Sequence, residues 1–476
     1  MPANPPRSGW TLAIVSIALF MTALDNLVVG VALPSIRVDL GGSIESLEWT
    51  VNAYTLTFAV LLITGAALGD RFGRKRMFVI GLAIFTVASA LAALAPTLEG
   101  LIAARALQGL GAAIVLTLTL LSEAVPAAKR GMALGIWAGV SGLGVAVGPF
   151  VGGAVVEGIA WQWIFWLNVP IGLVLLPLAA RRLTESHGPA GRLDLPGLVL
   201  AGAGLFGLTF GIVRATALGW TSATVIVSIG AGVALLAAFL WWELRAPAPT
   251  LPLRFFRSRA FAASNGVSFA MFFGVFGSIF LLSQFFQTAQ GYSPFEAGLR
   301  TLPWTGMPMI VAPIAGLLSD RIGSRPLMVA GLALQSVALL WLAAISSPDT
   351  AYASLVAPFV IAGTGMALVF APSANAVLGA VRPEEAGQAS GATNAIRELG
   401  GVMGVAVLAT VFSAHGSYAT PQAFSDGVVA ALPIGASVLA LGALVALFVP
   451  GVRARRAPAV KAPVPAGAGA AAEAVS

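Results

Sequence analysis

Long apolar runs separated by short polar breaks follow one another along almost the whole chain. A helix that crosses a bilayer needs about 20 consecutive, mainly apolar residues. Fourteen runs meet that requirement, and each is expected to form one membrane-spanning helix. Their expected bounds are residues 10–34, 47–68, 77–95, 98–121, 132–156, 163–180, 195–215, 222–242, 262–286, 297–319, 327–345, 352–378, 386–412 and 427–449.

The composition supports an all-α integral membrane protein. Hydrophobic residues make up 58% of the chain and charged residues only 9%, whereas a soluble domain carries about 25% charged residues. The chain therefore has too few charges to cover a surface that faces water. It has no cysteine and only two histidines, so no disulfide, thiol nucleophile or metal site is expected. The first run is too long for the core of a signal peptide and is interpreted as a retained span.

The basic residues indicate the orientation of the chain. All but five of the 26 Lys and Arg residues fall in loops on one side of the predicted membrane. Loops rich in Lys and Arg stay in the cytoplasm, and an even number of spans places both termini there. We therefore expect a multi-pass protein of a bacterial-type cell (inner) membrane. The net charge of +7 is explained by this topology, and no nucleic-acid partner is expected.

One loop motif occurs twice. The segment GAALGDRFGRKR (65–76) follows the second span and GLLSDRIGSRP (316–326) follows the tenth, so that Asp70 and Asp320 lie 250 residues apart. Duplicated halves with a site between them are common in transporters. The repeat predicts one six-helix bundle at 10–180, two linker helices at 195–242 and a second six-helix bundle at 262–449. The low-complexity tail, 457–476, is expected to be disordered and cytoplasmic.

The charges of the loop motif suit a conformational latch, because ion pairs between helices can hold one of two conformers. The candidate latch residues are Asp70, Arg71, Gly73, Arg74, Asp320 and Arg321. The alternative is that these loops only set the topology. Lys and Arg alone would satisfy that alternative, whereas the repeated Asp and Gly favour the latch.

Asp25 and Arg105 are charged residues inside predicted spans. Charges there are costly and usually functional. At a rise of 1.5 Å per residue, both lie about 10–14 Å below the outer surface, so they can form an ion pair. Protonation of Asp25 would release Arg105, and the pair would then couple transport to protons. A static structural pair is the alternative. Gln108, one helical turn from Arg105, is expected to add a hydrogen bond.

Five motifs together carry a family resemblance. They are LDNLVVGVALP (24–34), GDRFGRKRM (69–77), RALQGLGAA (105–113), GVAVGPFVGG (144–153) and WQWIFWLNVP (161–170). In this order they resemble the major facilitator superfamily, and within it the fourteen-helix drug:proton antiporter family of multidrug efflux type. The chain departs from the family pattern at Leu27 and Gly30, where Thr and Asn are usual, and at Gln162, where Arg is common.

The resemblance implies the major facilitator fold, with two inserted linker helices between two six-helix bundles. It also implies that the fifth-helix motif seals the central cavity against proton leak. That motif contains Gly144, Gly148, Pro149, Gly152 and Gly153. Small residues also let helices approach closely in lipid, so ordinary helix packing is the alternative interpretation.

The second half offers fewer charges. Arg397 and Glu398 fall in the middle of the thirteenth span and point about 100° apart around the helix. Because some family members use an acid in this helix, Glu398 is a second candidate proton or substrate site. Alternatively, Glu398 neutralises Arg397 or another polar group in the bundle. A pocket for amphipathic substrates needs apolar surface with a few polar groups; its candidate residues are Asn52, Tyr54, Gln108, Phe273, Phe276, Gln284, Gln287, Trp304 and Asn394.

No phosphate-binding loop or catalytic motif is present, and neither an enzyme nor a cofactor is expected. The sequence predicts a monomeric, proton-coupled antiporter that exports drugs, antibiotics or similar amphipathic compounds by alternating access among membrane lipids. One alternative is a proton-coupled exporter of a specific lipid or natural product. A more remote alternative is a membrane sensor that transports nothing, which would have no need for the buried carboxylate of Asp25.

Overall fold

The computed structural model describes residues 8–41, 44–115, 120, 125, 130–188, 194–247, 249, 251–382 and 385–451. Every regular element within these ranges is helical. Twelve of these helices are long and apolar enough to cross a membrane, and the number is thirteen if a bent pair counts as one span. The count of fourteen is not confirmed: residues 116–119 and 121 of the fourth expected span, and the tail 457–476, lie outside the described residues.

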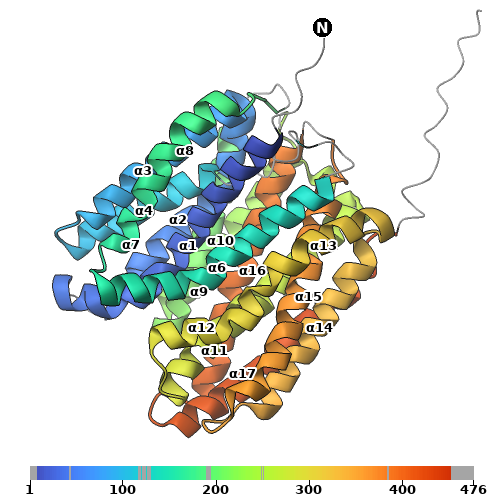
Figure 1. The fold of residues 1–476 in the computed structure, drawn as a ribbon. Helices are drawn as coiled ribbons and strands as arrows, with labels where there is room; N and C mark the ends of the chain where they lie inside the picture. Colours follow the sequence, from blue (N-terminus) through green and yellow to red (C-terminus); the bar gives the residue numbers. More distant parts are fainter. Residues whose placement is uncertain are drawn as a thin grey trace, which may run out of the picture.

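The first half of the chain forms one group of helices. Its members are α1 (Ser8–Leu40), α2 (Ile44–Phe72), α3 (Arg74–Ala93), α4 (Leu98–Val115), α6 (Arg130–Gly158), α7 (Trp163–Trp166) and α8 (Asn168–Arg182). Helix α1 packs against α6, and α4 packs against α2 and α3. α2 is bent by 51° between Leu62 and Thr64. Figure 1 shows this group in blue and green on one side of the molecule.

The second half forms the matching group. It contains α11 (Arg259–Gln284), η3 (Phe285–Ala289), α12 (Pro294–Thr305), α13 (Met307–Ile322), α14 (Ser324–Ile345), α15 (Tyr352–Leu378), α16 (Ala386–His415) and α17 (Pro421–Ala446). Helix α11 packs against α16 and α17, and α14 against α15 and α17. These helices run from yellow-green to red in Figure 1.

A helical hairpin lies between the two groups in the sequence. It consists of α9 (Leu195–Leu218) and α10 (Ala223–Glu243), and the short helix η2 (Leu253–Arg257) follows it. Helix α9 packs against both α2 and α16. The indole N–H of Trp220, beyond the end of α9, donates to Thr410 Oγ1 of α16 over 2.6 Å. The hairpin therefore covers the line along which the two halves meet.

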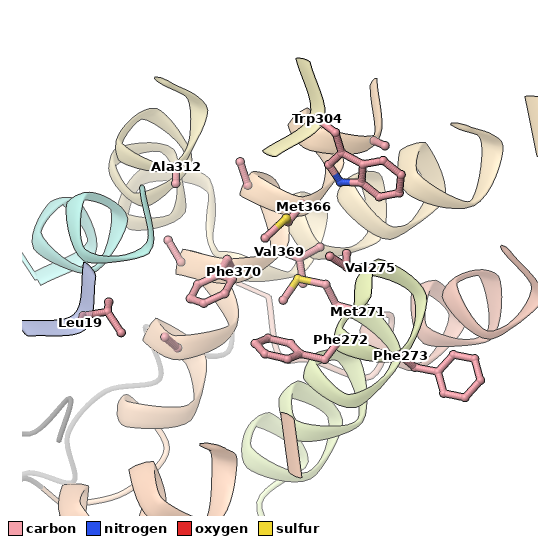
Figure 2. Close-up of a cluster of buried hydrophobic side chains, with 14 of the residues drawn as sticks. Leu19, Met271, Phe272, Phe273, Val275, Trp304, Ala312, Met366, Val369 and Phe370 are labelled. Carbon is pink, nitrogen blue, oxygen red and sulfur yellow. The ribbon is translucent and has the colours of Figure 1, made fainter. Parts of the chain in front are cut away.

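The two halves meet through α2 and α6 of the first half. α2 packs against α16, and α6 packs against α12, α13 and α15. One buried apolar cluster also extends through both halves. Figure 2 shows its centre, where Met271 and Phe272 of α11 and Met366 and Phe370 of α15 gather, with Leu19 of α1 to one side.

The two copies of the loop motif form the same turn. α2 ends and α3 begins around Gly73, and α13 ends and α14 begins around Gly323. The φ angles of these glycines are +104° and +87°, a region that residues with a side chain rarely adopt. The glycine of the repeat is thus required by the backbone. We call the end of the bundle that carries these two turns the motif end, and the opposite end the far end.

Candidate functional site

Asp25 of α1 and Arg105 of α4 form an ion pair inside the first half. Asp25 is 2% exposed and Arg105 is fully buried. The pairing predicted from their matched depth is therefore present. A buried charge is tolerated when an opposite charge and hydrogen bonds replace the water that it has lost.

Two amides complete the surroundings of the carboxylate. Gln108 Nε2 donates to Asp25 Oδ1 over 3.1 Å, and Asn168 Nδ2 of α8 donates to the same oxygen over 2.7 Å. The Gln108 amide also donates to Ser89 Oγ of α3 over 2.8 Å. The predicted hydrogen bond of Gln108 is thus present. Together with Arg105, the carboxylate receives three donors from two other helices.

Arg105 makes further contacts besides its ion pair with Asp25. Its Nε donates to the carbonyl oxygen of Thr50 over 3.0 Å, and its Nη1 donates to Gln108 Oε1 over 2.8 Å. The guanidinium lies 4.4 Å from the ring centre of Tyr54, close enough for a cation–π interaction. The Tyr54 hydroxyl donates to the carbonyl oxygen of Thr22 over 3.2 Å. Five helices of the first half therefore converge on one ion pair. Among the residues that the structure describes, no group of three or more acids and histidines could hold a metal ion.

Sequence reasoning missed Asn168, Ser89 and Thr50. Asn168 lies within the WQWIFWLNVP motif and is the first residue of α8, just after the break that separates α7 from α8. A polar residue at the start of a helix in such a motif was the available signal. Ser89 gave no comparable signal, because an isolated serine in a membrane helix commonly bonds to its own backbone, as its hydroxyl also does here with Phe85. Thr50 acts through its backbone carbonyl, which no residue type reveals.

The loop motif holds Asp70 at the end of α2. Arg74 Nε donates to Asp70 Oδ1 over 2.8 Å, and Arg74 is almost fully buried. The segment 184–188 after α8 lies over this turn: Gly188 N donates to the Asp70 carbonyl, and Arg74 N donates to the Ser186 carbonyl, both over 2.9 Å. The carboxylate of Glu185 accepts the backbone N–H groups of Lys75 and Arg76 and so caps the start of α3.

Asp70 also reaches the other half of the molecule. A Cβ on Gly387, in the first turn of α16, would stand 2.3 Å from Asp70 Oδ1. The carboxylate therefore lies against the N-terminal turn of α16, where unpaired backbone N–H groups favour a negative charge. Asp70, one of the predicted latch residues, therefore contacts the second half at the motif end, and its action as a latch stays a prediction. Arg71 is exposed beside it.

The second copy of the motif is more open. Asp320 and Arg321 are both exposed. Asn375 Nδ2 of α15 lies 3.3 Å from Asp320 Oδ1, and the hydroxyls of Ser319 and Ser324 are hydrogen-bonded over 3.0 Å. This copy therefore joins α13 to α14 and α15 within the second half, whereas the first copy also faces the opposite half.

The glycines of the fifth-helix motif line two contacts of α6. Gly144 lies against Phe20 and Ala23 of α1, Gly152 lies against Val28 of α1, and Gly153 lies against Phe295 of α12. Gly148 is buried, and the side chain of Pro149 lies outside the part of the chain that the structure describes. The motif therefore serves close packing both within the first half and across to the second.

An equivalent of this motif in the second half was missed. The residues GVAV occur at 144–147 in α6 and again at 404–407 in α16. In α16, Gly400 lies against the carbonyl oxygen of Phe269 and Gly404 against that of Phe273, both of α11. Helix α16 thus packs on the first helix of its half as α6 does on α1. The repeated tetrapeptide was the signal.

Arg397 and Glu398 have different surroundings. Arg397 is 1% exposed, donates to Ser373 Oγ over 3.2 Å and lies 5.0 Å from the ring centre of Phe370. Glu398 is half-buried and interacts electrostatically with Arg397 and, across the two halves, with Tyr54. Glu398 therefore lies where α16 faces α2.

The residues predicted to form a substrate pocket lie on several helices of both halves. Tyr54 and Gln108 belong to the surroundings of Asp25 and Arg105. Trp304 is buried against Phe359. Phe276 stacks on Phe272, Phe273 lies against Gly404, and Asn394 lies in α16. Gln284 accepts a hydrogen bond from Tyr418 near the far end, where Gln287 is exposed, and Asn52 is half-buried in α2. The pocket stays a prediction.

Comparison with known proteins identifies relatives over most of the chain. A family model described as Major Facilitator Superfamily matches residues 15–199 and 197–405. The chain is 37% identical over 408 residues to the multidrug resistance protein Stp of Mycobacterium tuberculosis (strain CDC 1551 / Oshkosh), covering 85% of this chain and 76% of that protein. It is 34% identical over 434 residues to the tetracenomycin C resistance and export protein of Streptomyces glaucescens, covering 89% of this chain and 80% of the relative.

The fold also matches a solved transporter. The structure of the proton:xylose symporter XylE superposes with a TM-score of 0.68, at 15% sequence identity, over 93% of this chain and 96% of that one. At this identity the match supports the fold alone.

Proposed function

The chain belongs to the major facilitator superfamily, and its relatives include a multidrug resistance protein and an export protein. We therefore propose that it is a proton-coupled antiporter that exports small amphipathic or hydrophobic compounds. It is a multi-span membrane transporter, not an enzyme. We further propose that it acts as a monomer in a bacterial-type cell membrane, with both termini and the motif end in the cytoplasm.

The observation that carries the proposal is the carboxylate of Asp25, buried with Arg105 inside the first half. A proton on Asp25 removes the negative charge that balances Arg105, and the freed guanidinium then favours a different arrangement of the helices around it. Coulomb attraction is strong in such a poorly polarisable environment, so one proton is enough to shift a balance between two conformers.

The transport cycle follows from the two ends of the molecule. Substrate enters from the cytoplasm or the inner leaflet and is released at the far end. Protons from outside bind to Asp25 and, as a second proton site, to Glu398. Their binding returns the carrier to the conformer that accepts substrate. The contact of Asp70 with the first turn of α16 holds the motif end closed in one conformer and breaks in the other, as alternating access requires.

Purified protein in vesicles with an imposed proton gradient tests this function. We expect gradient-driven transport of an amphipathic dye or antibiotic, and proton release when substrate is added to the detergent-solubilised protein. Asp25→Asn is expected to retain substrate binding but to lose gradient-driven transport and to release fewer protons per bound substrate. If Asp25→Asn leaves both intact, Asp25 does not couple transport to protons.

The alternative function is proton-coupled export of one lipid or natural product. The relative from Streptomyces glaucescens, whose name includes export of tetracenomycin C, favours it. A panel of unrelated dyes and antibiotics distinguishes the two functions, because a dedicated exporter transports one chemical class and a multidrug exporter several. The remote alternative, a sensor, predicts no gradient-driven transport of any compound.

A further inference from the structure

Asn168 is a buried residue whose amide nitrogen makes a hydrogen bond while its amide oxygen makes none with the described residues. It is 1% exposed and lies at the start of α8, facing α1. Its Nδ2 donates to Asp25 Oδ1 over 2.7 Å. Its own Oδ1 is buried and accepts no hydrogen bond from any described residue. A buried acceptor without a donor costs free energy. The position of Asn168 Oδ1 beside the Asp25 carboxylate therefore suggests that this oxygen accepts a hydrogen bond in another state of the protein.

The hydrogen bonds around Asp25 suit only the ionised carboxylate. Oδ1 receives the amides of Gln108 and Asn168, and Oδ2 receives Arg105. All three partners are donors. A protonated carboxyl group carries an O–H that must itself donate to an acceptor. Protonation therefore cannot occur in this arrangement without moving at least one partner.

Among the described side chains, few acceptors lie near Asp25. Gln108 Oε1 already accepts from Arg105 Nη1, and Ser89 Oγ already accepts from Gln108. Asn168 Oδ1 is unoccupied, and it is joined to the same amide that already contacts the carboxylate. A half-turn of this amide about its Cβ–Cγ bond would bring Oδ1 to the place of Nδ2.

We propose that Asn168 is a positioning residue that responds to the protonation of Asp25 by reversing its amide. The inference rests on the proposed function, in which Asp25 takes up a proton from the far end. The proton bonds to Asp25 Oδ1, and the new O–H donates to Asn168 Oδ1. Asn168 makes one hydrogen bond to Asp25 in either state. No covalent bond other than the new O–H changes, and the positive charge of Arg105 becomes uncompensated.

The remaining groups around Asp25 do not offer this exchange. The charged or titratable neighbours are Arg105 of α4 and Tyr54 of α2. Glu398 of α16 interacts electrostatically with Tyr54. From α8 the uncharged Asn168 contacts the carboxylate, and from α3 the uncharged Ser89 is joined to it only through Gln108. Helix α6 presents Gly144 and Gly152 to this part of α1. Asn168 is therefore the one described neighbour whose side chain donates to the Asp25 carboxylate and also holds an acceptor that receives no hydrogen bond.

The test compares Asn168→Leu with Asn168→Thr in vesicles across a range of external pH. Leu has a similar size but neither donates nor accepts, whereas the Thr hydroxyl does both by rotating. Hydrogen bonds to a charged group are roughly twice as strong as neutral ones, so the Leu variant weakens the ionised form of Asp25 more than the protonated form. We expect the pH of half-maximal transport to rise by about one unit in Asn168→Leu, and to stay close to the wild-type value in Asn168→Thr.

A spectroscopic measurement reports the hydrogen bond itself. The infrared carbonyl band of protonated Asp25, identified by its loss in Asp25→Asn, should shift in Asn168→Leu but persist near its place in Asn168→Thr. An unchanged pH midpoint and an unchanged band in Asn168→Leu would overturn the inference. So would a midpoint that moves as far in the Thr variant as in the Leu variant.

Two further results keep the test decisive. If Asn168→Leu does not fold, Asn168→Asp replaces it: two carboxyl groups in contact cannot both ionise readily, so we expect the midpoint to rise by more than one unit, and an unmoved midpoint overturns the inference. If the wild-type protein shows no gradient-driven transport, the proposed function fails and this inference fails with it. Wild-type transport with an unresponsive Asn168→Leu rejects the inference alone.

Discussion

The carbonyl oxygen of Phe273 in α11 lies 2.1 Å from the point that a Cβ on Gly404 of α16 would occupy. The backbones of the two helices are in contact there. The contact of α6 with α1 is its equivalent in the first half. Both α6 and α16 thus pack against the first helix of their own half. They also contact the opposite half, α6 through α12, α13 and α15, and α16 through α2.

Gly404→Ala is expected to destabilise the protein. The added methyl group meets a backbone atom, which cannot rotate away, and overpacking of this kind costs about 1–3 kcal/mol. Gly401→Ala is the matched control, because its Cβ would lie 3.5 Å from the nearest atom, in the side chain of Phe276. In an otherwise suitable helix position, alanine is favoured over glycine by up to about 1 kcal/mol. Thermal unfolding in detergent should therefore show a lower Tm for Gly404→Ala only.

The ion pair of Asp25 and Arg105 predicts non-additive stability. Removing one partner of a buried pair leaves an uncompensated charge and costs about 3–5 kcal/mol, whereas replacing both is much less costly. We expect Asp25→Asn and Arg105→Gln each to lower the Tm, and the double variant to be more stable than Arg105→Gln or Asp25→Asn alone. Additive losses in this double-mutant cycle would mean that the two side chains do not stabilise each other.

Disturbing the latch should shift the balance between the two conformers. Gly387→Ala places a methyl group 2.3 Å from Asp70 Oδ1 and forces the carboxylate away from α16, whereas at Gly69, within the same motif, a Cβ would meet no atom closer than 3.8 Å. The chain has no cysteine, so a single cysteine at the buried Ser390 reports on access from the motif end. We expect faster labelling by a polar maleimide in Gly387→Ala, and an unchanged rate in Gly69→Ala.

Equal labelling in the two variants would contradict a role for this contact in closing the motif end. Transport measured on the same samples separates a shifted balance from misfolding, because a shifted carrier still binds substrate.

The helical fold and the central pair were predictable because both depend on quantities that a sequence contains. Run length determines whether a helix can cross a membrane, and distance from a span end determines the depth of a charge. The similar depth of Asp25 and Arg105 in their spans predicted the ion pair that the structure contains. The count of fourteen spans is not confirmed, because a bent helix such as α2 and the limits of the described ranges leave twelve or thirteen candidates.

The rest of the site depends on rotation about helix axes and on backbone groups. Asn168 faces Asp25 because α8 restarts after the break that follows α7, and no periodicity predicts where such a restart points. Thr50 contributes a carbonyl oxygen, which every residue has. The contact of Asp70 with Gly387 joins residues of different halves, and only the packing of α2 on α16 brings them together. Depth along a helix is readable from sequence, whereas direction around it requires the fold.

The position of Glu398 leads to a prediction about the number of protons released per bound substrate. Its neighbour Arg397 donates to Ser373 and lies among aromatic rings within the second half, while Glu398 faces the first half near Tyr54. If Glu398 takes up a proton in each cycle beside Asp25, Glu398→Gln should lower the protons released per bound substrate by about half, because one of two carboxyl groups no longer ionises. Substrate-induced proton release in weakly buffered detergent solution measures this directly.

The competing explanation, that Glu398 only neutralises Arg397, makes a different prediction. Removing the carboxylate would then leave a buried cation uncompensated, so Glu398→Gln would lower the Tm, and Arg397→Gln added to it would restore stability without changing proton release. A proton site predicts the reverse: proton release falls in Glu398→Gln and does not recover in the double variant. Unchanged proton release in Glu398→Gln would leave Asp25 as the sole coupling carboxylate, and the guanidinium of Arg105 as the charge that drives the conformational change.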